Sequence, residues 1–96
     1  MSAQVADRID FKAVDPSSGL VPALIWGKLK QSAGHGPVVI VLNGTVCAVS
    51  EIFRQEGAPS FAGFANDALF RPGANDLALY ELIEGKQPQL RPIAIG

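Results

Sequence analysis

The chain has few of the residues that form disulfides, metal sites or catalytic sites in many small proteins. Its 96 residues include one cysteine, one histidine, one tryptophan and one tyrosine. The single thiol, Cys47, cannot form an internal disulfide or a cysteine-based zinc site. Its neighbours in TVCAV are uncharged and largely apolar, with no cation to favour a thiolate, so we expect Cys47 to be buried and unreactive. The fold is therefore expected to depend on its hydrophobic core.

An excess of one charge and a long apolar run are also missing. Eight basic and nine acidic residues are scattered along the chain and give a net charge of −1. This balance argues against a nucleic-acid partner and against electrostatic binding to a membrane. The longest uncharged apolar stretch, residues 37–42, is far shorter than the ~20 residues that span a bilayer, so we expect no direct membrane insertion. The first ten residues do not have the basic-then-apolar pattern of a signal peptide.

Residue patterns typical of catalysis are not found either. His35 lies between glycines in SAGHGP, where we expect it to be exposed and without a role. Neither Ser50 nor Ser60 follows the strand-to-helix pattern of a nucleophilic serine. The acidic residues are not clustered with the spacing of a calcium loop. We expect no catalytic residue, no cofactor and no metal site, so this chain alone is not expected to be an enzyme.

The residues that are present describe an ordinary globular domain. Hydrophobic residues make up 48% of the chain and charged residues 18%, which is far from the disordered class. A chain of this length accommodates one small domain, and we assign residues 1–96 to it. Both ends look like cuts within strand-like sequence, so we expect the domain to be a fragment of a longer polypeptide.

Apolar and polar residues alternate along most of the chain, and turn signals recur about every ten residues. This pattern predicts seven strands, separated by turns, and one short helical turn at residues 66–70 with Asn66 as its cap. We therefore expect an all-β fold, an antiparallel β-sandwich of about seven strands with an immunoglobulin-like arrangement. The predicted strands are residues 8–14, 20–30, 37–42, 45–53, 58–65, 77–83 and 89–95.

Asn43-Gly44-Thr45 can be interpreted as a glycosylation acceptor or as a tight turn. Asn-Gly between two apolar runs is the strongest short signal for a two-residue type I′ hairpin, because both residues must take a positive φ. We favour the turn. It pairs Leu42 with Thr45, and the pairs that follow are Val41 with Val46 and Ile40 with Cys47. Both faces of this hairpin are then apolar, with Val49 on the same face as Ile40 and Cys47. We therefore expect the hairpin to be central and covered on both sides.

Further turns and edges follow from glycine and proline. In residues 71–76, RPGAND, Pro72 and Gly73 are expected at the central positions of a type II turn, followed by Asn75. Pro22 and Pro92 lack a backbone donor, so each is expected at an edge or bulge of the sheet.

A few side chains are candidates for contact with a ligand or another domain. The phenylalanines are predicted to be core residues. Trp26 and Tyr80 each have a polar atom on a large ring and are predicted to lie in the core or at an interdomain contact; exposed, they would suit stacking on a sugar. Arg54 and Arg71 are predicted to be solvated at strand or turn ends, where either can meet an anionic partner.

Residues 21–82 resemble a known family. The shared features are an aromatic-glycine pair in an opening strand, a strand ending in Asn-Gly, a ring in the next strand, and an FRPG-x-N segment before an aliphatic-aromatic strand. The chain resembles the C-terminal β-domain appended to some bacterial sulfatase-like proteins of the alkaline-phosphatase superfamily, including membrane-anchored relatives of phosphoglycerol transferases. The matching residues are Trp26, Gly27, Asn43, Gly44, Phe61, Phe70, Arg71, Pro72, Gly73, Asn75 and Tyr80.

The resemblance implies a location and a partner. The metal ligands and nucleophile of that family lie in a catalytic domain that this sequence does not contain, so no catalytic residue is carried over. The implied location is extracytoplasmic, in the periplasm or at the outer face of the cytoplasmic membrane. The implied role is non-catalytic: an accessory domain that packs on, or orients, the catalytic domain of its parent polypeptide.

The alternative is an independent module for adhesion or for binding cell-envelope glycan. Docking on another domain predicts a contiguous exposed apolar patch. Glycan binding predicts a groove or flat face with an exposed Trp26 or Tyr80.

Overall fold

The computed structural model describes residues 2–6, 24–30, 37–83 and 85–95. Three sequence predictions lie outside these residues: the strand at 8–14, the position of Pro22 and the exposure of His35.

Eight strands lie within the described residues, and the all-β prediction is confirmed. The predicted strands at 77–83 and 89–95 have the bounds that alternation and the flanking turns predicted. The segment at 66–70 contains the 3-10 turn η3, where the amide N of Ala68 donates to Oδ1 of Asn66 at 2.9 Å. The elements are β1 (Ser2–Val5), β2 (Leu24–Lys30), β3 (Val38–Leu42), β4 (Thr45–Ser50), β5 (Phe53–Gln55), β6 (Ala58–Phe64), η3 (Asp67–Leu69), β7 (Leu77–Ile83) and β8 (Gln89–Ile95).

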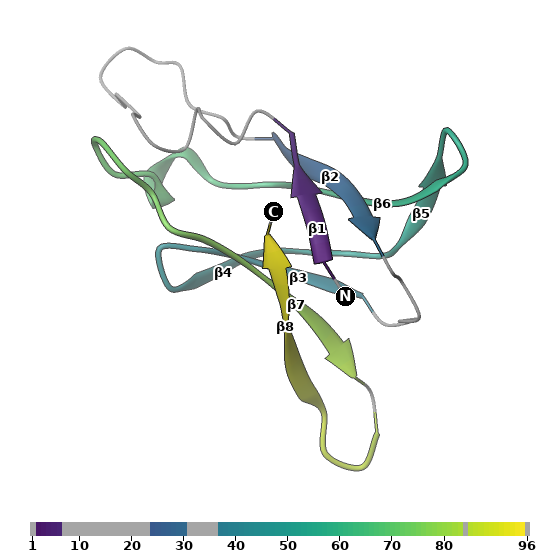
Figure 1. Cartoon of the computed structure of the whole chain (residues 1–96). Coiled ribbons are helices and arrows are strands. Elements are labelled where there is room, and N and C mark those ends of the chain that lie inside the picture. Colours follow the sequence, from purple (N-terminus) through teal and green to yellow (C-terminus); the bar gives the residue numbers. More distant parts are fainter. Residues whose placement is uncertain (1, 7–23, 31–36, 84, 96) are drawn as a thin grey trace.

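The strands form one curled sheet in the order β4-β3-β7-β8-β1-β2-β6-β5 (Figure 1). We call β4, β3, β7 and β8 the lower half and β1, β2, β6 and β5 the upper half. The halves join where β1 pairs parallel with β8, Ser2 opposite Ala94 and Ala3 opposite Ile95. The sheet is therefore mixed, because β1, a strand that the sequence did not predict, makes a parallel pairing. A two-sheet sandwich and an immunoglobulin-like arrangement are not confirmed.

The two edge strands of this sheet, β4 and β5, are consecutive in the chain. Only Glu51 and Ile52 separate them, so the predicted single strand at 45–53 is in fact two strands with a bend between them. Ser50 lies at the bend: its Oγ accepts a hydrogen bond from the amide N of Ala62 in β6 at 3.0 Å. It also donates to the carbonyl of Glu51 at 2.9 Å. The chain thus crosses from the lower half to the upper half and ties the two together.

The core lies between the two halves. A Cβ added to Gly63 in β6 would lie 2.6 Å from Cβ of Ala48 and 2.9 Å from Cδ1 of Ile40. The two halves therefore approach too closely at position 63 for any residue other than glycine. The buried hydrophobic cluster comprises Ala3, Ile25, Leu29, Val38, Ile40, Leu42, Phe61, Ala65, Phe70, Leu79 and Ile93.

The β3–β4 hairpin has the predicted turn but not the predicted register. Asn43 and Gly44 have φ of 52° and 82°, as a type I′ turn requires, and Leu42 lies opposite Thr45. A bulge then places Ile40 opposite Ala48, and Cys47 is left as the extra residue.

The bulge and the strand order overturn two predictions for this hairpin. Beyond Cys47 each side chain points to the face opposite the one predicted, so Val49 is 60% exposed rather than buried. The hairpin is not central either, because β4 is an edge strand and β3 lies next to it.

Candidate functional site

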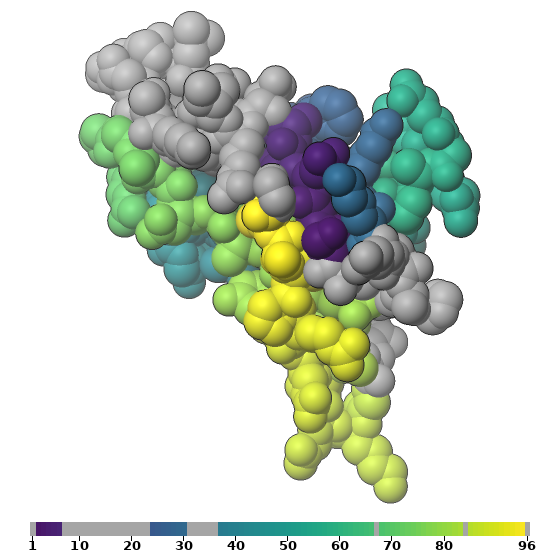
Figure 2. Space-filling model, viewed as in Figure 1, coloured from purple at the N-terminus to yellow at the C-terminus, as the bar shows by residue number. Residues whose placement is uncertain are grey.

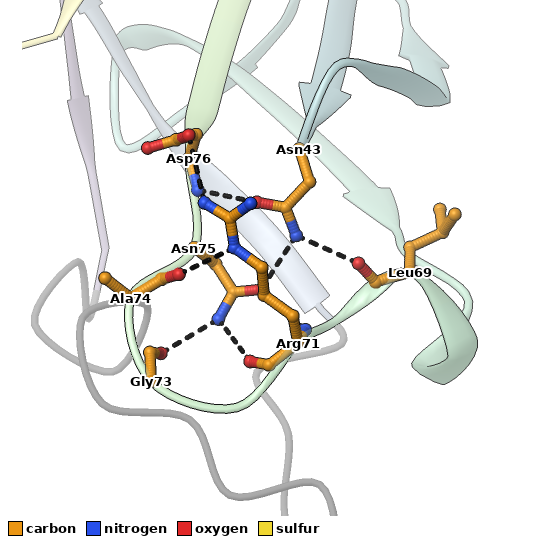
Figure 3. Close-up of polar contacts among 7 residues, drawn as sticks. All are labelled: Asn43, Leu69, Arg71, Gly73, Ala74, Asn75 and Asp76. Carbon is orange, nitrogen blue, oxygen red and sulfur yellow. Dashed lines mark hydrogen bonds and ion pairs between the residues drawn. The ribbon is translucent and has the colours of Figure 1, made fainter.

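A cluster of polar contacts fixes the β3–β4 turn to residues 69–76, which we call the 69–76 loop (Figure 3). Nδ2 of Asn43 donates to the carbonyl of Leu69 at 3.0 Å and to Oδ1 of Asn75 at 2.8 Å. Oδ1 of Asn43 accepts from the backbone N of Asp76 at 2.8 Å, and the backbone N of Asn43 donates to the carbonyl of Asp76 at 2.8 Å. A turn residue from one hairpin thus organises a loop more than 25 residues away in the sequence.

Asn75 is the buried partner in this cluster, with 8% of its surface exposed. Its Nδ2 donates to the carbonyls of Arg71 and Gly73 at 2.9 and 3.0 Å. Its Oδ1 accepts from the backbone N of Arg71 at 2.9 Å as well as from Asn43. Both amide hydrogens and both lone pairs are used, which is the full capacity of this side chain.

The rim of the cluster is exposed and contributes less. The Arg71 guanidinium donates to the carbonyl of Ala74 at 3.0 Å and meets Asp76 at 3.1 Å. These two side chains are 53% and 85% exposed, so their attraction is screened by water. Gly73 has φ 82°, the conformation that the third residue of a type II turn needs.

The cluster bears on the two interpretations of Asn43-Gly44-Thr45. A glycan would be attached through Nδ2 of Asn43, and both hydrogens of this atom are already donated within the protein. The geometry therefore favours the turn, and the cluster acts as a structural clamp. Among the described residues, no buried side-chain nitrogen or oxygen is left without a hydrogen-bond partner.

A second feature is an apolar row on the outer face of the upper half. Leu24 of β2 lies directly opposite Phe64 of β6, and Trp26 lies opposite Ala62 on the same face. Leu24, Trp26 and Phe64 are 47%, 36% and 74% exposed. Large apolar side chains grouped in this way are unusual on a solvated sheet face.

A shallow hollow of about 350 Å³ opens beside this row. Gln4 and Val5 of β1, Ala6, and Trp26, Gly27 and Lys28 of β2 line it. The backbone N of Ala6 donates to the carbonyl of Trp26 at 2.9 Å, which holds the end of β1 against β2. The ammonium of Lys28 meets the carboxylate of Glu56 at 3.2 Å. The residues that line the hollow therefore include an indole, a side-chain amide and the lysine of this ion pair.

The predicted contact residues do not form one site. Arg54 lies in β5 and donates to the carbonyl of Gly57 at 2.8 Å, within its own hairpin. Tyr80 lies in β7, half-buried between Val39 and Pro92 in the register. Trp26 lies in the other half of the sheet, partly exposed on its outer face.

Several aromatic assignments need correction. Of the two placements predicted for Trp26, the core is wrong, because its phase in β2 points outward while Ile25 and Leu29 point inward. The interdomain contact stays a prediction. Phe61 and Phe70 are core residues as predicted, but Phe53 and Phe64 are 42% and 74% exposed. The apolar residues in both phases of LIWGKL were the available signal for this outer face.

Cys47 is half-buried at the bulge, not fully enclosed, and its Sγ donates to the carbonyl of Ile40 at 3.4 Å. Burial raises the pKa of the Cys47 thiol above its ordinary value, and a backbone hydrogen bond opposes this with a smaller effect. The thiol thus stays protonated at neutral pH.

Within the described part of the chain, no three His, Cys, Asp or Glu side chains are grouped so as to hold a metal ion. No helix there has the length and hydropathy needed to cross a bilayer.

Comparisons with known proteins give no further guide. No protein-family model, no curated protein and no solved structure matches this chain.

Proposed function

We propose that the chain is a non-catalytic accessory β-domain of an extracytoplasmic sulfatase-like protein, and that it packs on the catalytic domain of that polypeptide. The observation that carries this proposal is the exposed row of Leu24, Trp26 and Phe64. Fully burying one such side chain is worth about 1.5–3 kcal/mol relative to full exposure, so covering the row would stabilise a docked arrangement.

The choice of partner rests on the resemblance over residues 21–82. That segment contains β2 and β6, the two strands that present the row. In the family that this segment resembles, the β-domain is appended to a catalytic domain, which is therefore the partner that we propose. The same proposal includes the classification of the fold as an immunoglobulin-like β-sandwich.

The first test is the size of the native polypeptide. An antibody raised against this domain is used to probe membrane and periplasmic fractions of the source cell. We expect a band several times larger than the 10.1 kDa of this chain. A band near that mass would contradict the accessory-domain proposal.

The second test addresses the docking face in the longer polypeptide. Phe64→Ser is expected to expose the junction between domains to limited proteolysis, since it places a hydroxyl in the apolar row. Val49→Ser, which changes a 60% exposed valine on β4, is the matched control and should leave the cleavage pattern unchanged. Equal cleavage of both variants would show that the row is not the interface.

The hollow beside Trp26 favours one alternative, an independent module that binds cell-envelope glycan. A partly exposed indole next to an amide and an ammonium is the combination that sugar sites use, with the ring stacking on the sugar and polar groups on its hydroxyls. Trp26 is the one tryptophan of the chain, so its fluorescence reports on this hollow alone. A saturable fluorescence change on titration with peptidoglycan fragments, lost in Gln4→Ala with the fold retained, would support the alternative. An unchanged signal would count against it.

A further inference from the structure

The asparagine that anchors the β3–β4 turn belongs to a dipeptide prone to a spontaneous chemical change. In Asn-Gly, the backbone nitrogen of the glycine attacks Cγ of the asparagine, since glycine has no Cβ to hinder the approach. This closes a five-membered succinimide ring and releases Nδ2 as ammonia. Water then opens the ring at either carbonyl, which leaves an aspartate or an isoaspartate. No electrons are transferred, and water is the only co-reactant.

The folded geometry opposes this reaction at Asn43. Ring closure requires Cγ of Asn43 to approach the backbone nitrogen of Gly44, the next residue of the same turn. The amide is instead held against the 69–76 loop by hydrogen bonds to Leu69, Asn75 and Asp76, at 3.0, 2.8 and 2.8 Å. All three have to break before the ring can close.

We propose that Asn43 is a succinimide-forming modification site that the 69–76 loop keeps closed, so that modification proceeds only when this corner of the fold opens. The rate at Asn43 should then follow the population of the open form. Three hydrogen bonds of ordinary net strength correspond to roughly 10- to 1,000-fold protection.

The product cannot restore the clamp. A carboxylate has no hydrogen to donate, and it would face two acceptors, the carbonyl of Leu69 and Oδ1 of Asn75. An isoaspartate would also add a methylene to the backbone of a two-residue turn, which disrupts the pairing of Leu42 with Thr45. The change is therefore one-way, and each modified molecule keeps a loosened loop.

The experiment is peptide mapping by mass spectrometry after incubation of the full chain in mildly alkaline buffer. Wild type is compared in native buffer and in denaturant, with Asn66 and Asn75, each followed by an aspartate, as internal controls. In the wild type we expect modification at Asn43 to be about tenfold or more slower in native buffer. Equal rates in the two buffers would overturn the proposal.

Two variants test the role of the loop. Asn75→Ala removes the buried partner and should speed modification at Asn43 in native buffer. Glu56→Ala removes a carboxylate that is 77% exposed and lies in the β5–β6 turn, outside the cluster, so its rate should equal that of the wild type. An Asn75→Ala variant that is folded by circular dichroism but reacts at the wild-type rate would refute the proposal. If that variant does not fold, Gly73→Ala, which strains the 69–76 loop at a residue with φ 82°, takes its place with the same two outcomes.

Discussion

Asn75 shows how much one side chain of the right geometry contributes in this small protein. Its amide makes four hydrogen bonds in a buried setting and closes the 69–76 loop on itself and on the β3–β4 turn. Removing the side chain would break all four of these part-buried hydrogen bonds at once. Asn66, which caps η3 from an exposed position through one hydrogen bond, offers a direct comparison.

Asn75→Ala is expected to lower the free energy of unfolding by about 2–4 kcal/mol, because four part-buried hydrogen bonds are lost together. Asn66→Ala should lower it by about 0.5–1 kcal/mol, as for an exposed cap. Urea denaturation followed by circular dichroism measures both values. Similar losses in the two variants would show that the Asn75 cluster is not a special source of stability.

Cys47 is a residue whose burial creates a dependence on pH. Because the pKa of its thiol is raised in the folded protein, the unfolded chain ionises first as the pH rises. The stability that this group contributes is present below the thiol pKa of the unfolded chain and is lost as the pH rises through the pKa of the folded state.

We therefore expect the wild type to lose more stability than Cys47→Ala between neutral and alkaline pH. Urea titrations of both proteins at the two pH values measure the difference, and other titrating groups cancel in the comparison. Alkylation of Cys47 by iodoacetamide should also be slower in the folded than in the unfolded chain. Parallel pH dependences in the two proteins would refute the assignment.

At the scale of elements, the strands predicted best are those whose signals are local. In β7 and β8, long alternating runs end at turn residues, and both bounds follow from the sequence. The Asn-Gly turn could likewise be predicted from its local sequence. The bulge at Cys47 could not be predicted, since the strand is apolar in both phases and a shift of the alternation by one residue leaves no mark in its sequence. The packing of Ala48 against β6 selects the bulge.

The β5–β6 hairpin was missed for a related reason. Its turn residues, Glu56 and Gly57, have φ of 55° and 78°, the same left-handed pair as in the β3–β4 hairpin. Glutamate is seldom found in this conformation, because its Cβ crowds the backbone. Glu56 is therefore a strained residue in a turn that the sequence does not signal.

Glu56→Asn is expected to raise the free energy of unfolding by about 0.5–1 kcal/mol, because asparagine tolerates the left-handed region better. Glu56→Ala separates this gain from the exposed ion pair with Lys28, which is worth about 0–1 kcal/mol; this control should be no more stable than the wild type. Thermal denaturation of the three proteins measures the effect. If asparagine and alanine behave alike, the turn is not strained.

At the scale of the whole molecule, the arrangement depends on contacts that sequence patterns do not contain. The parallel pairing of β1 with β8 joins residues more than 90 positions apart, and SAQV is too short to show alternation. The close approach of the halves at Gly63 is also non-local. Composition and period thus indicated an all-β domain, but they did not distinguish two sheets from one curled sheet. The same limit applied to the site, where Asn43 and Asn75 were each assigned to a turn and their contact across 32 positions was not foreseen.

Gly63→Ala tests the contact between the halves. The added Cβ would overlap Ala48 and Ile40, and the expected loss is about 1–3 kcal/mol, typical of overpacking. Gly85→Ala is the matched control, since a Cβ there meets nothing within 4 Å, and its stability should stay within about 0.5 kcal/mol of the wild type. Denaturant melts of both variants decide the point, and an unaffected Gly63→Ala would mean that the halves can separate without cost.

The β7–β8 hairpin projects from the body of the molecule (Figure 2), and its second strand, β8, also pairs with β1. The pairing of β1 with β8 determines how the molecule would respond to tension. Among the described residues the first and last strands, β1 and β8, run parallel, with Ser2 opposite Ala94. Tension applied to these ends would pull β1 and β8 in opposite directions along their common axis. The hydrogen bonds between them would be loaded in shear and would have to fail together, whereas strands peeled apart fail one bond at a time. Within the part of the chain that the structure describes, two residue pairs share this load, so β1 is expected to detach before the lower half of the sheet unfolds.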